Sequence, residues 1–141
     1  MSLAISKTTI DTNLLTKLDE FNYSDIIRAI LAKQPDFDTN KWLGEFKKYM
    51  YFVIHTNQSF HVPSHKLDEV WHALILDTKL YQEFNAALSP HRFIHHKSVS
   101  EQFASDDILI SKAKLSKIAI ETFGEDFTWD TNAAICWCDV S

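Results

Sequence analysis

Histidine and aspartate residues with the spacing of metal ligands lie in the middle of the chain. All seven histidines fall within residues 55–96, and residues 61–72 read HVPSHKLDEVWH. If this segment is a helix, with roughly 100° of rotation per residue, His65, Asp68 and His72 fall within an arc of about 60°. Three side chains able to bind a metal would then lie on one helical face.

These residue types suit Zn²⁺ or non-haem Fe²⁺, which bind imidazole and carboxylate groups. Asp68 and His72 are four residues apart, a spacing at which one helix supplies two ligands to one ion. We expect His95 and His96 to lie in a loop that folds back over this helix, with one of them as a further ligand. His65 would be a fourth ligand or a proton carrier, because imidazole exchanges protons near neutral pH. A metal-bound water could then act as nucleophile or base.

The same residues also allow a structural interpretation that needs no metal. Polar residues on one helical face often do no more than face solvent. Alternatively, Asp68 and His72 would pair with His95, with His96 or with backbone groups, and hold the later segment onto the helix. Leaving one buried partner of such a network unpaired costs about 1–3 kcal/mol. The sequence leaves these interpretations open, and with them the question whether the protein is an enzyme.

Hydrophobic residues recur at helical spacing along most of the chain, which predicts an all-α fold. The two glycines and three prolines are too few for a turn-rich β-sandwich or barrel. We therefore expect one compact domain, residues 1–141, with five or six helices. Its last part, residues 125–141, is a tail whose hydrophobic residues follow no clear helical or strand spacing. The predicted helices cover about 12–21, 24–34, 41–57, 65–75, 78–88 and 98–124.

Four residues around the histidines are expected to support this arrangement. Ser64 is a candidate N-cap for the helix that begins near His65, and Thr78 is expected to cap the next helix. Trp71 and Tyr81 are expected in the core, where the indole N–H of Trp71 would need a hydrogen-bond partner.

Charge and hydrophobicity exclude several classes of partner. The 141 residues carry a net charge of −5 and no Lys/Arg-rich run, so we expect no nucleic-acid partner. No apolar run approaches the roughly 20 residues that span a bilayer, so we expect no membrane partner. The first residues lack the pattern of a signal peptide, and we expect a cytoplasmic location. A protein or a small molecule stays open as the partner, and a monomer or a homodimer as the assembly.

The only two cysteines, Cys136 and Cys138, form a C-x-C pair near the end of the sequence. Such a pair does not indicate a framework of disulfides. It is either a pair of ordinary thiols or a soft-metal ligand pair, which would bind Zn²⁺ or Cu⁺ only with further ligands or a second chain.

The stretch PSHKLDEVWHALILDTKLYQEF followed by FIHH resembles the motif of the glycine-rich domain-containing protein-like family. The resemblance covers about residues 40–97, and it implies a helical region but no settled activity. Members with a similar motif often end in a tail rich in Gly and Cys, whereas this chain has only AAICWCDVS, and the resemblance adds a remnant of such a tail as a third interpretation of the C-x-C pair. The matching positions are Pro63, Ser64, Asp68, Trp71, His72, Thr78, Tyr81, His95 and His96.

Together these features predict a small, soluble helical module that acts in binding or structure, with a His/Asp site able to hold a divalent metal. The alternative is a metal-dependent enzyme of unknown substrate, with zinc or non-haem iron held by Asp68, His72 and His95 or His96. In the binding interpretation, the tail with Trp129 and Trp137 is a candidate partner-binding segment.

Overall fold

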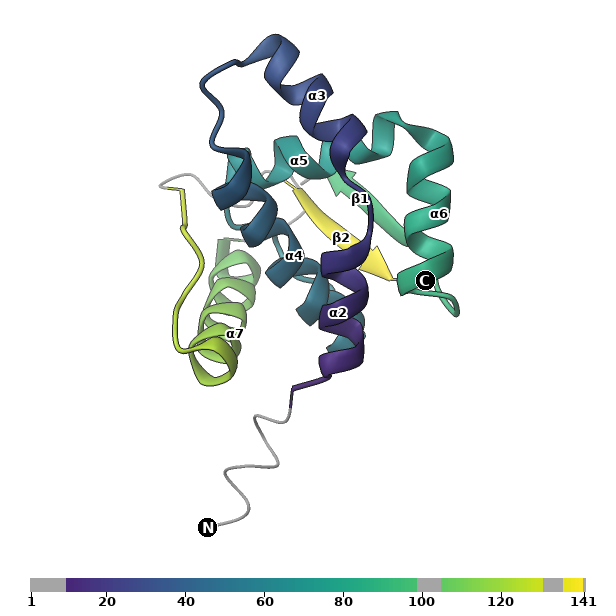
Figure 1. Ribbon diagram of the computed structural model, residues 1–141. Helices are drawn as coiled ribbons and strands as arrows, with labels where there is room; N and C mark the ends of the chain where they lie inside the picture. The colour runs from purple at the N-terminus through teal and green to yellow at the C-terminus, as the bar shows by residue number, and fades with distance from the viewer. Residues whose placement is uncertain (1–9, 99–104, 131–135, 141) are drawn as a thin grey trace.

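This computed structural model describes residues 10–98, 105–130 and 136–140 of the chain. Within them lie six helices and two short strands (Figure 1). The predicted helical fold is therefore confirmed. The strands are a small addition that the sequence pattern did not indicate. In chain order the elements are α2 (Thr12–Glu20), α3 (Ser24–Lys33), α4 (Thr39–Thr56), α5 (His65–Leu76), α6 (Thr78–Leu88), β1 (Ile94–Ser98), α7 (Ser105–Phe123) and β2 (Cys136–Val140).

Four of the helices begin at a side chain that caps the first turn. In each case a carboxylate or hydroxyl oxygen accepts a hydrogen bond from a backbone N–H that would otherwise lack a partner in the helix. This local chemistry explains why the predicted starts at residues 12, 65 and 78 agree with the structure. The capping residues are Asp11, Asp38, Ser64 and Asp77, before α2, α4, α5 and α6.

Three of the predicted helix starts differ in detail from the structure. Tyr23 occupies the cap position of α3 and makes no capping hydrogen bond through its side chain, while Ser24 is already inside the helix. Asp77, not Thr78, caps α6, with its Oδ1 3.2 Å from the Leu80 nitrogen. Ser98, expected at the start of the last helix, is the final residue of β1. At the start of α6 the sequence offered two polar residues, Asp77 and Thr78, and only the backbone path selects which one caps the helix.

The core lies between α4 and α5 and is rich in aromatic residues. Helix α5 packs against α4, α3 and α6, and α2 packs against α4 and α6. Trp71 on α5 is fully buried against Tyr49 on α4, with 5.8 Å between the ring centres. Tyr81 is also buried, so the two core positions predicted beside the histidines are confirmed.

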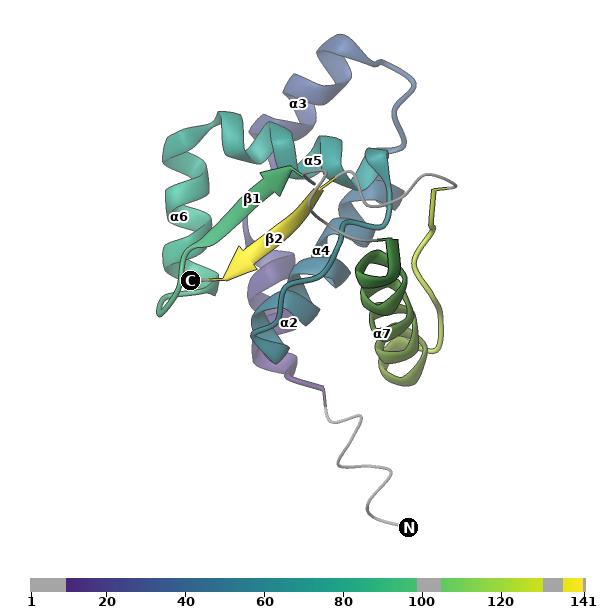
Figure 2. The ribbon, with the colours of Figure 1, turned by 180° about the vertical axis from the view of Figure 1, so that it is seen from behind.

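The two strands form an antiparallel pair on one side of the helices (Figure 2). Ile94 pairs with Val140, and the register continues to Ser98 opposite Cys136. The sequence predicts a loop at His95 and His96 and no regular element in the tail, so both strands differ from the prediction. Each strand is only five residues long, which is too short for a clear alternating pattern, and its partner lies far away in the sequence.

The segment after α7 returns along the helical core. The backbone N–H of Thr128 donates to Glu45 Oε1 at 2.7 Å, and the N–H of Asp130 donates to the Pro63 carbonyl at 3.0 Å. Glu45 is buried on α4 and also forms an ion pair with Lys48, 2.8 Å from Oε2 to Nζ. None of the described helices has the length and apolar character needed to cross a membrane.

Candidate functional site

Asp68 and His96 form the closest polar contact among the predicted site residues. Asp68 comes from the first turns of α5 and His96 from the middle of β1. The distance from His96 Nε2 to Asp68 Oδ1 is 2.6 Å, and each side chain is only 17% exposed. A short, mostly buried hydrogen bond between an imidazole and a carboxylate holds the strand onto the helix.

The His96 ring is also fixed by aromatic packing. It meets the Trp71 ring edge to face, with 4.5 Å between the ring centres. Trp71 lies three residues after Asp68 on α5, so both side chains face the same strand. The imidazole is therefore held by a carboxylate and packed against an indole.

A buried hydrogen-bond network extends this contact to α6. The indole nitrogen of Trp71 donates to the Tyr81 hydroxyl at 3.1 Å, and that hydroxyl donates to the Ile94 carbonyl at 2.5 Å. Asn85 on α6 accepts from the Ile94 N–H at 2.8 Å and donates to the Tyr81 carbonyl at 3.0 Å. The start of β1 thus receives both of its backbone partners from α6.

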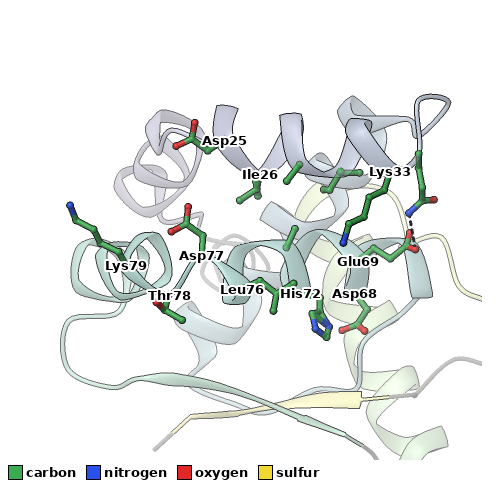
Figure 3. A pocket seen from close by; sticks show the side chains of 14 residues that line it. Asp25, Ile26, Lys33, Asp68, Glu69, His72, Leu76, Asp77, Thr78 and Lys79 are labelled. Atoms are coloured by element: carbon green, nitrogen blue, oxygen red, sulfur yellow. Dashed lines mark hydrogen bonds between the residues drawn. The ribbon is translucent and has the colours of Figure 1, made fainter.

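His72 is exposed and lies beside the Asp68–His96 pair. Its ring centre is 6.0 Å from that of His96. In Figure 3, Asp68 and His72 lie next to each other on the side of α5 nearer the strands. The predicted placement of Asp68 and His72 on one helical face is therefore observed, and His96 is the partner that meets it.

The other two predicted histidines lie apart from this group. His95 precedes His96 on β1, so its side chain leaves the opposite face of the strand, where it is exposed and packs against Phe93 at 5.0 Å. His65 is exposed at the start of α5, and its backbone N–H donates to Asp130 Oδ2 at 2.6 Å. The structure thus selects His96 from the pair that the sequence could not separate.

The geometry of the Asp68–His96 pair fits a direct hydrogen bond better than two ligands of one ion. A metal at about 2.0–2.2 Å from each ligand atom requires those atoms to be roughly 3 Å apart. Among the described residues, no three His, Cys, Asp or Glu side chains form a group that could hold a metal. The side chains of Cys136 and Cys138 lie outside the described part, although their backbone forms β2 opposite β1.

A groove between α3 and α5 adjoins this pair (Figure 3). Its volume is about 690 Å³, and Asp68 and His72 lie on its wall. The lining includes the aliphatic side chains Ile26, Ala29, Ile30, Ala73 and Leu76, and Leu76 is 68% exposed although it is apolar. Apolar surface next to a few polar groups is the usual composition of a ligand site.

Polar side chains enter the groove from both helices. Glu69 on α5 accepts a hydrogen bond from Gln34 at 3.1 Å through Oε1. Its second oxygen, Oε2, is buried and has no hydrogen-bond partner among the described residues. Lys33 extends from α3 toward α5 in the same region (Figure 3). The groove therefore has a polar end near Glu69.

Sequence reasoning placed Asp68 and His72 in the candidate site but missed the groove residues on α3. Asp25, Lys33 and Gln34 look like ordinary surface residues, because the packing of α3 on α5 depends on side chains distant in sequence. The spacing of the α3 apolar stripe could have indicated a buried face but not which helix it meets.

In comparisons with protein-family models, with curated protein sequences and with solved structures, we found no significant match to this chain. The resemblance to the glycine-rich domain-containing protein-like family stays a prediction.

Proposed function

We propose that the chain is a small helical binding module whose ligand lies in the α3–α5 groove. The groove itself carries this proposal, since its 690 Å³ falls within the range of about 300–1,000 Å³ common for small-molecule sites. The aliphatic lining of the groove would bury the apolar part of a ligand, and the polar ends of the groove would orient that ligand. Asp68 and His72 are on its wall, which links the groove to the motif found in the sequence.

In this proposal the Asp68–His96 pair positions one wall of the groove. The 2.6 Å hydrogen bond fixes the Asp68 carboxylate relative to β1, and the Trp71–Tyr81 network fixes α5 relative to α6. Preformed walls lower the entropy that a ligand must lose on binding, so a rigid pair of this kind favours affinity.

A titration with backbone-amide NMR tests the binding proposal. A set of small amines, carboxylic acids and neutral aromatic compounds is added to the ¹⁵N-labelled chain, and we expect at least one class to shift amides of α3 and α5 together. Ala29→Phe, which fills the groove, should abolish these shifts. Ala32→Phe is the matched control, because Ala32 is exposed on the same helix and does not line the groove. Shifts that survive Ala29→Phe would overturn the proposal.

The second proposed function is a site for a divalent metal, zinc or iron, in a binding or enzymatic role. It is supported by the nearness of Asp68, His72 and His96, although the 2.6 Å hydrogen bond would have to open. The chain, prepared without a histidine tag, is analysed by plasma mass spectrometry beside the double variant Asp68→Ala/His72→Ala. A stoichiometric metal lost in the variant supports this function, metal retained in the variant points to Cys136 and Cys138, and no metal in either refutes it.

The proposal includes a cytoplasmic location, a small molecule or protein as partner, and membership of the glycine-rich domain-containing protein-like family. The assembly is proposed as a monomer or a homodimer, which sedimentation at two concentrations distinguishes.

A further inference from the structure

Carboxylates lie at both ends of the α3–α5 groove, and aliphatic side chains lie between them. Asp25 and Asp77 are at one end, and Asp68 and Glu69 are at the other (Figure 3). Among the described residues, four carboxylates and two lysines, Lys33 and Lys79, line the groove, and Arg28 pairs with Asp25 from outside the lining. This excess of negative charge favours a cationic ligand over an anionic one.

The distance between the two ends defines the length of such a ligand. Glu69 and Asp77 are eight residues apart along α5 and its C-terminal cap, which corresponds to about 12 Å at 1.5 Å per residue. The floor between them contains Ile26, Ile30 and Ala73, which offer no polar side-chain partner. A matching ligand has two cationic ends joined by a flexible apolar chain.

The two lysines on the lining differ in their relation to the groove. Lys79 extends away from it, whereas Lys33 reaches across from α3 toward Glu69 (Figure 3). Within the described part of the chain, Lys33 forms no ion pair. Its side chain is exposed and flexible, so an incoming ammonium group can displace it.

Each end also retains an oxygen for a ligand. The buried Glu69 Oε2 has no donor among the described residues, and a buried acceptor gains stability when a donor reaches it. At the other end, Arg28 pairs with Asp25 through Oδ1, and Asp77 caps α6 through Oδ1. The second oxygen of each aspartate is not used by these contacts.

We infer that the groove binds a linear aliphatic polyamine. One ammonium group lies between Asp25 and Asp77, the other lies at Glu69 beside Asp68, and the methylene chain lies on the aliphatic floor. This inference rests on the proposed binding function and adds the chemical class of the ligand.

Calorimetry and amide NMR in physiological salt test it with four probes: octane diamine, butane diamine, octylamine and octanedioic acid. We expect octane diamine to bind tightest, because only its two ammonium groups reach both ends at once. Glu69→Gln and Asp25→Asn should each weaken its binding roughly fivefold. Glu83→Gln is the matched control, because it removes the same charge from an exposed position of α6 outside the groove. Lys33→Met should tighten binding.

Each other outcome overturns the inference in a distinguishable way. If octylamine binds in the groove as tightly as octane diamine, the binding module stands and the polyamine assignment fails. If octanedioic acid binds best and Lys33→Met abolishes its binding, the ligand is an anion. If Glu83→Gln weakens binding as much as Glu69→Gln, the diamine binds by general charge attraction. If no ligand of any class shifts α3 and α5 amides, the proposed function fails as well.

Discussion

Removing the Asp68 carboxylate should destabilise the fold through loss of its bond to His96. Both side chains are 17% exposed and 2.6 Å apart, so the bond lies in a mostly dry environment against Trp71. Hydrogen bonds to charged groups contribute about 1.5–3 kcal/mol. We therefore expect Asp68→Ala to lower the free energy of unfolding by about 2 kcal/mol. For a chain of this size, that corresponds to a fall in Tm of roughly 6–10 °C.

A double-mutant cycle separates the bond from other effects of truncation. Urea unfolding of the wild-type chain, Asp68→Ala, His96→Ala and the double variant should give a coupling free energy of about 1–2 kcal/mol. His65→Ala is the matched control, because this exposed histidine is on the same helix, and its hydrogen bond to Asp130 comes from the backbone N–H, which the substitution keeps. A coupling free energy near zero would refute the assignment of the pair as the contact that holds β1 on α5.

Three further predictions follow from buried polar groups. Tyr81→Phe removes the hydroxyl that joins Trp71 to the Ile94 carbonyl. It should lower the free energy of unfolding, measured with urea, by about 2–3 kcal/mol. An unchanged urea midpoint would contradict the hydrogen-bond network. Glu45→Ala removes the acceptor of the Thr128 N–H and should speed hydrogen exchange at that amide. Glu125→Ala should leave this exchange unchanged, because the Glu125 side chain is 72% exposed in its ion pair with Lys48. Burial raises the pKa of the Tyr23 phenol, with Asp19 adding to the shift. Because the unfolded chain loses this proton at a lower pH than the folded chain, stability should fall as pH rises above about 10, and less steeply in Tyr23→Phe.

The Asp68–His96 geometry favours the structural interpretation of the motif over a metal site. A metal site needs ligand atoms arranged around a common centre, whereas the pair meets directly and His72 stays exposed beside it. The Trp71–Tyr81–Ile94 hydrogen bonds belong to the same contact between helices and strand. These contacts support a structural role for the motif, and the adjoining groove is the site that we propose for ligand binding.

Features governed by near neighbours could be predicted from the sequence. The helix at α5 begins after Ser64 because its hydroxyl reaches a backbone N–H three residues later. The shared face of Asp68 and His72 follows from helical geometry alone, and the burial of Trp71 follows from its place in the apolar stripe. Such properties depend on residues within one or two turns, and the local sequence contains the needed information.

Only the tertiary structure decided which distant segments meet. His96, not His95, contacts Asp68 because Tyr81 and Asn85 on α6 bind the backbone of Ile94, and alternate residues of the strand then point to opposite faces. The groove exists because α3 packs beside α5, and its charge comes from both helices. A shift of β1 by one residue along the helices would turn the other histidine inward, and no local pattern in IHHKS specifies where the strand is held.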